Sequence, residues 1–404
     1  MTSSAEQPEI TSGMVLLLAF AAGVIVANLY YAQTLVGPIS QATGLSAQAS
    51  GLIVTLTQLG YVIGLLFIVP LGDVIENRQL VVGALAFCAA ALATAAMSSS
   101  GWVFLAAALA IGIGSVAAQV LVPYAAHLSP APRRGHVVGK VVSGLLLGIM
   151  LARPVASLVA DASNWHVVFA GAAALVALLA LVLRARLPRR VPEAPLPYAR
   201  LIGSLWTLFA GTPLLRRRAA YQAGLFGAFS LFWTVAPLML AGPVFHLSQT
   251  GIAIFALVGM AGAVASPVAG RLADAGHTLA ATGAALALGV AGLALPLLAS
   301  GSREVALGIL VAASIILDMA VAANLVIGQR AIFGMAADVR SRLNGLYLAC
   351  FFLGGAAGSA LGGYVYATRG WHAALLAGMA FPALGLAWWL VEWKVDTGRD
   401  RALE

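Results

Sequence analysis

The sequence predicts an all-α integral membrane protein of twelve transmembrane helices, arranged as two six-helix bundles. Three observations support this fold class: the composition, the length of the apolar segments, and short motifs that recur in the two halves of the chain. Of the 404 residues, 61% are hydrophobic and 9% are charged, and the mean hydropathy is +0.98. Soluble domains carry about 25% charged residues, so this chain has too few charged groups to cover a soluble globule of its size.

Twelve apolar segments are each long enough to cross a bilayer, which takes about 20 residues per helix. The segments are long and continuous, which favours helices over the short alternating strands of a membrane barrel. The predicted spans are 13–37, 48–71, 79–98, 102–127, 139–160, 165–184, 218–241, 249–270, 278–299, 304–327, 343–367 and 371–391.

The basic residues predict the orientation of these spans. Of the 22 Lys and Arg residues, Arg303 and Arg369 fall in loops opposite the termini and Arg153 lies within a span, which leaves 19 on the side of the termini. The positive-inside rule makes that side the cytoplasm. Because the basic residues lie between apolar spans, they indicate membrane topology, and we expect no nucleic-acid partner.

A polar insert rich in proline and arginine divides the chain after the sixth span. It predicts an N-terminal six-helix bundle at 1–184, a cytoplasmic linker at 185–217, and a C-terminal six-helix bundle at 218–404 that ends in a short cytoplasmic tail. PLGDVIENRQL and GRLADAGH place Asp73 and Asp274 201 residues apart, and NWHVVFAGAA in the sixth span is echoed by GWHAALLAGMA in the twelfth. Such parallel repeats are a transporter architecture, with the substrate site between them near the membrane midplane.

Several motifs carry a closer resemblance: NLYYAQTL, PLGD followed by Arg78, AQVLVPYAAHL, GLLLGIMLARP, ILDMAVAANLVIGQ, RSRLNGLY and FFLGGAAGSALGG. Over essentially its full length the chain resembles transporters of the major facilitator superfamily, and the bacterial sugar and drug efflux permeases in particular. The family's loop motif runs Gly-x-x-x-Asp-Arg-x-Gly-Arg-Arg, and here Val74 and Asn77 replace two of its basic positions. The Gly-Pro-x-x-Gly-Gly signature of drug exporters is replaced by RPVAS.

The resemblance implies a major facilitator fold in a bacterial inner membrane and transport by rocking of the two bundles. It also implies proton-coupled efflux of a small organic molecule. In the family the loop motif bridges neighbouring helices and stabilises the outward-facing conformation, a role carried over to Asp73 and Arg78. Arg271 and Asp274 are their repeat counterparts. A helix cap combined with a topology signal is the alternative interpretation of these residues.

Arg153 and Asp318 are the two charged side chains that lie well inside predicted spans. A charge at the centre of a membrane helix costs roughly 2.5–3.5 kcal/mol on insertion scales, so each needs a bundle interior, a water-filled cavity or a partner. The helical rise places Arg153 roughly 20 Å and Asp318 roughly 8 Å above the inner boundary. We therefore do not expect direct contact between them in every state.

Arg153 lies at a depth similar to that of Asn28 in the first span, and Tyr31 shares a helical face with Asn28 through its i,i+3 spacing. This spacing predicts a polar cluster of Asn28, Tyr31 and Arg153. Two interpretations of Arg153 stay open. It locks the first and fifth spans together without touching a ligand, or it faces the central cavity and attracts an acidic or strongly hydrogen-bonding group of a substrate.

Asp318 is the predicted proton carrier, because burial favours the neutral form of a carboxyl group and so allows it to take up and release a proton. Gln119 lies 199 residues upstream at the corresponding position of the first repeat. A structural hydrogen bond between helices and a contact with substrate are the alternative roles of Asp318.

The candidate substrate-binding residues are polar or aromatic side chains inside the spans: Asn28, Tyr31, Gln33, Gln58, Tyr61, Gln119, Arg153, Trp233, Asn344 and Tyr347. The six histidines have no metal-ligand spacing, and there is no phosphate-binding loop or nucleophile motif, so we expect no enzyme activity, no metal site and no cofactor. The expected partners are a small-molecule substrate, protons and the lipid bilayer, with the chain a monomer. Uptake of a polar or anionic metabolite, and a membrane receptor or scaffold without transport, are the alternative functions.

Overall fold

The computed structural model describes residues 10–130, 132–192, 197–299, 301–335 and 339–403. Within these ranges, eleven helical segments are apolar and long enough to cross a membrane. The last of them, Arg340–Lys394, contains two passes, because Gly370 leaves the helical conformation at a φ of 79°. Glycine adopts this left-handed conformation without steric cost. The prediction of an all-α membrane fold with twelve passes is confirmed.

The first half of the chain contains eight α-helices joined by short helical turns. These are α1 (Ser12–Ala27), α2 (Tyr31–Thr43), η1 (Ala47–Ala49), α3 (Leu52–Ile63), η2 (Gly64–Ile68), η3 (Val69–Asp73), α4 (Asn77–Met97), α5 (Gly101–Ser115), α6 (Ala117–His127), α7 (Arg134–Ala162) and α8 (Trp165–Arg186).

The second half follows the helix α9 (Tyr198–Gly211), which lies in the predicted linker. It comprises α10 (Pro213–Ala241), α11 (Gln249–Gly259), η4 (Met260–Val264), α12 (Ala265–Asp274), α13 (Thr278–Ala294), η5 (Leu295–Leu298), α14 (Arg303–Phe333) and α15 (Arg340–Leu403). The helix α10 begins at Pro213, five residues before the predicted start of the seventh span.

The first span differs from the prediction of one continuous helix over 13–37. It runs from Ser12 to Thr43 and is interrupted at residues 28–30, where the chain makes hydrogen-bonded turns between α1 and α2. The fourth span is divided in the same way at Val116, between α5 and α6. These interruptions change the direction in which the following side chains point, and spacing rules for a continuous helix therefore fail across them.

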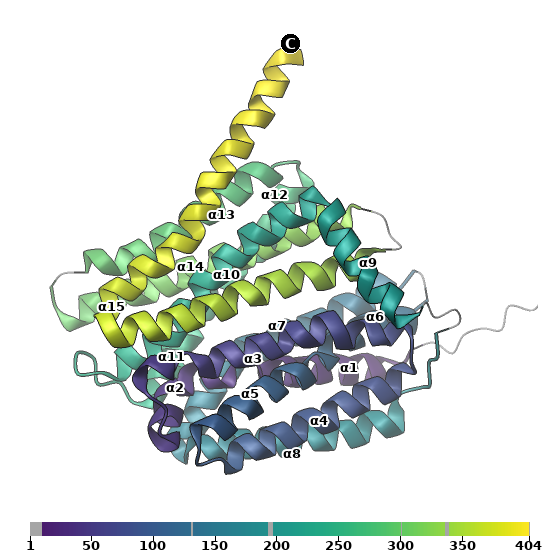
Figure 1. Cartoon of the computed structure of the whole chain (residues 1–404), viewed down its shortest axis with the longest axis horizontal. Coiled ribbons are helices and arrows are strands. Elements are labelled where there is room, and N and C mark those ends of the chain that lie inside the picture. The colour runs from purple at the N-terminus through teal and green to yellow at the C-terminus, as the bar shows by residue number, and fades with distance from the viewer. Residues whose placement is uncertain (1–9, 131, 193–196, 300, 336–338, 404) are drawn as a thin grey trace, which may run out of the picture.

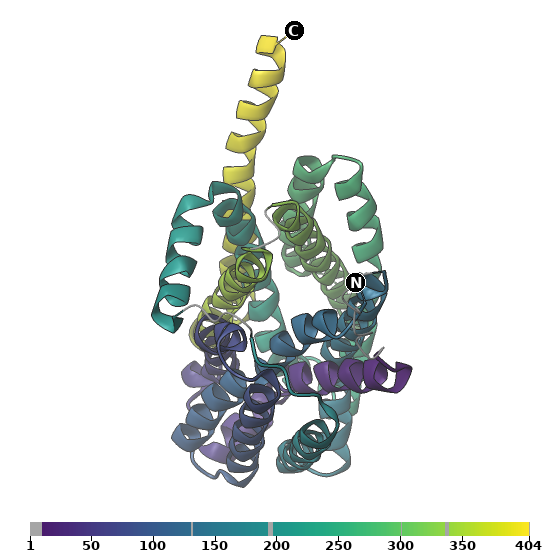
Figure 2. The same cartoon turned by 90° about the vertical axis from the view of Figure 1, so that its right-hand side faces the viewer.

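The two halves occupy different parts of the molecule. In Figure 1 the helices before the linker gather in the lower part of the view and most of those after it in the upper part, and Figure 2 shows the same separation from the end. We call the end that holds Ser12, α9 and the start of α10 the linker side, and the opposite end, which holds Gly44 and Gly370, the loop side.

Glycines allow the same close helix packing in each half. In the first half, a Cβ atom on Gly23 would meet the backbone of Gly144 in α7. In the second half, a Cβ atom on Gly354 or Gly358 of α15 would meet the backbone of α10 at Ala223 and Gly227. Small residues permit such backbone contacts between membrane helices. The first and fifth spans thus pack as the seventh and eleventh do, which agrees with a duplicated architecture.

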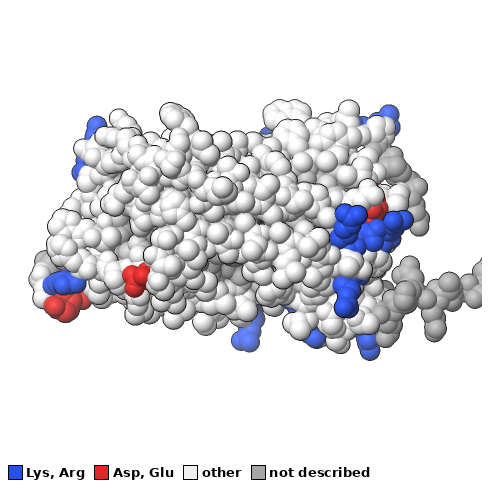
Figure 3. Space-filling model, turned by 90° about the horizontal axis from the view of Figure 1, so that it is seen from below, with Lys and Arg blue, Asp and Glu red and all other residues white. Residues whose placement is uncertain are grey.

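Charged side chains are concentrated at the ends of the molecule. In Figure 3 most of the visible face is white, and the largest group of Lys and Arg side chains lies towards the linker side. Large apolar side chains are exposed along the helices, among them Leu16, Phe20, Leu147 and Trp388. Such a surface is stable against lipid and would be unstable in water, so the outer faces of the helices are membrane-facing.

The halves meet most closely towards the loop side. The Thr55 hydroxyl in α3 lies 2.8 Å from that of Ser359 in α15, and Thr250 in α11 donates a hydrogen bond of 2.6 Å to Asp161 in α7. Gly51 packs against α15 so closely that neither it nor the facing Gly363 has room for a Cβ atom. These contacts close the loop side of the boundary between the halves.

Candidate functional site

A cluster of charged and aromatic side chains lies where the two halves meet. Arg153 comes from α7, Tyr30 from the interruption between α1 and α2, and Trp233 and Asp318 from α10 and α14. Arg153 is 5% exposed and Trp233 is fully buried, whereas Asp318 keeps part of its surface accessible. We call Tyr30, Arg153, Phe229, Trp233 and Asp318 the central cluster.

Trp233 joins the two charges of the central cluster. The guanidinium carbon of Arg153 lies 4.3 Å from the centre of the Trp233 ring, 5.0 Å from that of Phe229 and 5.7 Å from that of Tyr30. At the edge of the indole, Nε1 of Trp233 donates a hydrogen bond of 3.0 Å to Oδ1 of Asp318. The guanidinium is therefore attracted to aromatic ring faces, and the carboxylate is held by an indole N–H and not by the arginine.

The predicted cluster of Asn28, Tyr31 and Arg153 is wrong. The Asn28 amide donates to the carbonyl of Ile25 at 3.0 Å and approaches Sγ of Cys88 at 3.9 Å, so it faces α4. Tyr31 lines a membrane-facing groove beside Leu16 and other exposed apolar side chains. The physical reason is the interruption at residues 28–30, which turns Tyr30 and not Tyr31 towards Arg153.

Three predicted residues lie along the contact between the halves. Gln58 in α3 donates a hydrogen bond of 2.9 Å to Ser230 in α10. One turn further towards the linker side, the Tyr61 hydroxyl accepts a bond of 3.0 Å from Gln119, and its ring packs on Phe352 of α15 with 4.6 Å between ring centres. These contacts continue the closed boundary as far as Tyr61.

Three other predicted residues have different surroundings. Gln33 is fully buried, and neither polar atom of its side chain has a hydrogen-bond partner among the described residues. Asn344 accepts a bond of 3.2 Å from Gln329, and the Tyr347 hydroxyl approaches the carbonyl of Asn324 at 3.5 Å. These two contacts lie within the second half, so Asn344 and Tyr347 connect α14 to α15 and not the two halves.

The loop-motif residues do not bond to one another as a set. Arg78 donates to the carbonyls of Arg184 and Leu187, both at 3.4 Å, and so attaches the start of α4 to the end of α8. Asn77, which stands at a basic position of the family motif, accepts a bond of 2.6 Å from Arg190. In the second repeat, Asp274 pairs with Arg330 of α14, and Arg271 is exposed one turn earlier in α12.

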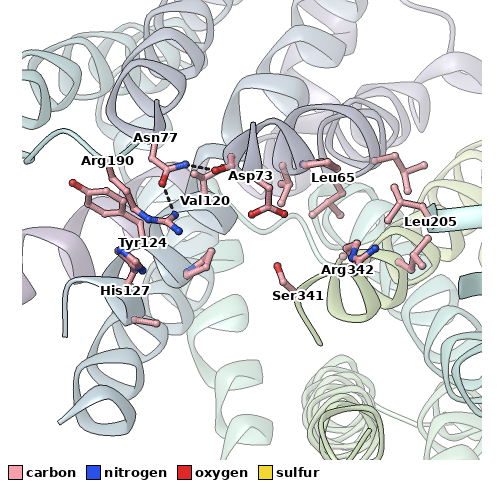
Figure 4. A pocket seen from close by; sticks show the side chains of 18 of the residues that line it. Leu65, Asp73, Asn77, Val120, Tyr124, His127, Arg190, Leu205, Ser341 and Arg342 are labelled. Carbon is pink, nitrogen blue, oxygen red and sulfur yellow. Dashed lines mark hydrogen bonds between the residues drawn. The ribbon is translucent and has the colours of Figure 1, made fainter. Parts of the chain in front are cut away.

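A cavity of about 310 Å³ opens on the linker side between the halves (Figure 4). We call it the vestibule. Asp73 points into it from the first half and faces Ser341 and Arg342 at the start of α15. The remaining polar lining consists of Asn77, Tyr124, His127, Arg134 and Arg190. Three arginines face one carboxylate, so the vestibule is electropositive.

Sequence reasoning missed two members of the central cluster. Phe229 precedes Trp233 by one helical turn, so helix periodicity could have placed both on one face. Tyr30 could not have been found in this way, because its orientation depends on the break in the first span. A further buried charge, Glu392, lies just beyond the predicted end of the last span, where it pairs with Arg217 at 3.0 Å.

The family model described as Major Facilitator Superfamily matches residues 15–311. The chain is 39% identical over 382 residues to a protein of Escherichia coli O157:H7 named uncharacterized transporter YgaY, covering 94% of this chain and 96% of that protein. It is 34% identical to a probable transporter of Streptomyces coelicolor over 91% of this chain and 85% of that one.

Solved structures show the same fold at low sequence identity. A bacterial homolog of the human lysosomal transporter Spinster, in an inward-facing and occupied conformation, matches with a TM-score of 0.71 at 15% identity, covering 95% of this chain and 97% of that one. The nucleoside transporter NupG matches with a TM-score of 0.69 at 16% identity, over 93% and 99% of the two chains. The class is therefore a multi-pass membrane transporter. The chain belongs to the major facilitator superfamily.

Proposed function

We propose that the chain is a proton-coupled secondary transporter of a small organic molecule, with the central cluster as its substrate and coupling site. The observation that carries this proposal is the meeting of Arg153 from one half with Trp233 and Asp318 from the other. Ionisable side chains inside a membrane are costly and mark ion and substrate pathways. A site composed of both halves changes whenever the halves rock, which is what alternating access requires.

The distribution of contacts supports this mechanism. The boundary between the halves is closed from Gly51 to Tyr61 and opens into the vestibule beyond Leu65. With the linker side in the cytoplasm, as the basic residues predict, this arrangement is an inward-facing one. Rocking would break the Thr55–Ser359 contact and bring Asp73 towards Arg342, so that the same central cluster is reached from the other side.

The direction of transport is proposed on two separate grounds. The resemblance to efflux permeases favours export, in which protons enter as substrate leaves. The guanidinium of Arg153 favours a second candidate, the uptake of an anionic metabolite, because a buried guanidinium attracts oxyanions. In both, Asp318 carries the proton, since it is the carboxyl group of the central cluster and is bonded to Trp233.

Proton flux in liposomes tests the proposal. The full chain is reconstituted with an internal pH-sensitive dye, and anionic, neutral and cationic organic compounds are added under an imposed pH gradient. We expect compounds of one charge class to drive proton movement in the wild type and none to do so in Asp318→Asn. Tyr347→Phe, which loses a single weak contact, is the matched control and should behave as the wild type.

A receptor or scaffold would give a different result. It predicts no proton movement with any compound and no change in the labelling of cysteines placed at Thr55 and Leu65. A transporter predicts that labelling at these two positions changes in opposite directions when a substrate is added. Wild-type proton flux in Asp318→Asn would exclude Asp318 as the coupling residue.

A further inference from the structure

Among the described residues, aromatic ring faces are the neighbours of the Arg153 guanidinium. Its side chain is surrounded by three aromatic rings, and Nε has no hydrogen-bond partner. None of the ion pairs of the described residues includes it. Ring faces attract the positive charge but accept its five N–H groups poorly. A buried guanidinium without an ionic partner is complementary to a carboxylate, because the two oxygens of a carboxylate can accept two parallel N–H hydrogen bonds from it.

Other buried polar atoms, on residues adjacent in the helices to members of the central cluster or bonded to such a residue, also lack partners within the described part of the chain. Ser157 follows Arg153 by one turn of α7 and is fully buried, with its hydroxyl oxygen unbonded. Gln33 follows Tyr30 by one turn of α2, and both polar atoms of its side chain are unbonded. Oε1 of Gln58 is unbonded as well, beside the bond from this side chain to Ser230. These atoms offer hydrogen bonds to hydroxyl groups, while the rings offer a flat apolar surface.

The charge balance of the central cluster has a consequence for an anion that would bind there. With Arg153 and Asp318 both ionised, the two charges compensate each other across the indole. Arg153 is the charged group of the described chain that acts on Asp318, and the Tyr30 phenol in turn faces Arg153. An added carboxylate would leave one uncompensated negative charge in a low-dielectric site, which is costly. Protonation of Asp318 removes that charge.

The indole of Trp233 contacts both groups, so protonation of Asp318 would affect the binding of an anion at Arg153. Trp233 donates to the Asp318 carboxylate and covers the Arg153 guanidinium at the same time. Hydrogen bonds to an ionised acceptor are roughly twice as strong as bonds between neutral groups. Protonation of Asp318 therefore weakens the bond that holds the indole over the guanidinium, and the ring can move aside for the carboxylate.

The vestibule, whose lining does not include the central cluster, would attract such a ligand to the linker side of the boundary between the halves. Arg134 donates to the Ala126 carbonyl, Arg190 to Asn77 and Arg342 to Ser204, so each guanidinium is anchored by a neutral group and keeps its charge uncompensated by these bonds. Asp73 is the single carboxylate among the described residues of the lining. A cleft lined mainly by one sign of charge concentrates ligands of the opposite sign.

We propose that the substrate is a small organic anion, a ring-bearing hydroxylated monocarboxylate that binds Arg153, and that it binds together with a proton on Asp318. Proton and anion are then carried in the same direction. This inference rests on the proposed function and names the substrate class of the same site. A cation exported in exchange for a proton would instead require Asp318 to be deprotonated. Arg153 would repel such a cation, and the cation would compete with the proton for Asp318.

Proton uptake on binding measures the sign of this coupling. Purified full-length protein is titrated with shikimate, quinate and glucuronate in weakly buffered detergent solution at pH 5.5 and pH 8, with the methyl ester of each as the neutral control. At least one acid is expected to bind with uptake of protons, and about tenfold or more tightly at the lower pH, within the usual range of coupling between sites. The matching ester is expected not to bind.

Two substitutions separate the roles of the charges. Asp318→Asn mimics the protonated acid, so it should bind the carboxylate at pH 8 as tightly as the wild type does at pH 5.5, without proton uptake. Arg153→Met should bind it at neither pH. Melting temperatures and elution profiles equal to those of the wild type establish that both variants are folded.

Several outcomes would overturn the inference. These are release of protons on binding, equal binding of acid and ester, weaker binding by Asp318→Asn, or no binding of any carboxylate by wild type and Asp318→Asn alike. If neutral or cationic compounds then still drive proton flux in liposomes, the proposed function stands and the anionic substrate class alone falls. If no compound of any charge drives flux, the proposed function falls with it.

Discussion

Two regions of the molecule bring an arginine close to a carboxylate inside the helical bundle, and they do so differently. On the linker side, Glu392 of α15 pairs with Arg217 at 3.0 Å and accepts a hydrogen bond of 2.6 Å from Tyr221, both in α10. The adjacent Arg218 donates to Thr282 of α13 at 2.8 Å. All these contacts lie within the second half of the chain.

In the central cluster the arginine and the carboxylate belong to different halves and are separated by an indole. The Glu392 group is a direct ion pair within one half, whereas the central cluster joins side chains from both halves. Under the proposed rocking, the first group would move as one body and the second would be rearranged. We therefore keep the proposed transport site at the central cluster and propose a packing role for Glu392.

The largest effect is expected from a substitution in the central cluster. Arg153→Met keeps much of the side-chain volume among the rings but removes the charge. Transport should fall about 30-fold or more, since loss of one partner of a buried charged contact costs about 2–5 kcal/mol of binding. Thermal stability in detergent should stay close to that of the wild type, because Asp318 can take up a proton when the opposite charge is removed and so avoids an uncompensated buried charge. A fall in stability that accounts for the lost transport would mean that Arg153 is structural.

The next effect concerns closure of the loop side. Gly363→Leu places a side chain where the backbone of Gly51 leaves no room, and overpacking of this kind costs about 1–3 kcal/mol. Transport should decrease about tenfold, and cysteine labelling at Thr55 should increase. Gly345→Ala is the matched control in the same helix, because its Cβ atom would meet nothing within 4 Å. Unchanged labelling at Thr55 would show that this contact does not control access.

A smaller effect is expected from the pair of Glu392, which is buried, and Arg217, which is partly exposed. Glu392→Gln leaves Arg217 without its ionic partner and should lower the free energy of unfolding by about 1–3 kcal/mol, measured by thermal unfolding in detergent. Transport per folded molecule should stay within about threefold of the wild type. Glu304→Gln, at an exposed position at the start of α14, should change neither quantity. Loss of proton coupling in Glu392→Gln would show that the Glu392 pair takes part in coupling, which contradicts the packing role proposed for it.

The smallest effect is expected at Tyr347. Its hydroxyl makes one long contact, 3.5 Å to the Asn324 carbonyl, within the second half. Tyr347→Phe should reduce stability by about 1 kcal/mol or less and leave the substrate affinity within about twofold. A large change in affinity with unchanged stability would place Tyr347 in contact with substrate.

The sequence was sufficient for the passes and for the two central charges. Arg153 and Asp318 are conspicuous because a charge inside an apolar helix needs an explanation from the surrounding bundle. The role of Trp233 as the link between them depends on packing between helices that are distant in the chain, and no spacing rule reports it. The neighbours of Arg153 were misassigned because the break at residues 28–30 has no strong signal: NLY contains neither glycine nor proline.

Comparison of exchange with accumulation tests the central claim most directly, namely that Asp318 couples proton movement to transport at a site composed of both halves. Proteoliposomes containing wild type, Asp318→Asn or Glu392→Gln are assayed with the compound that drives proton flux in the wild type. Asp318→Asn should exchange labelled for unlabelled compound but fail to accumulate it under a pH gradient, while Glu392→Gln accumulates it. Accumulation by Asp318→Asn at the wild-type level would contradict the claim.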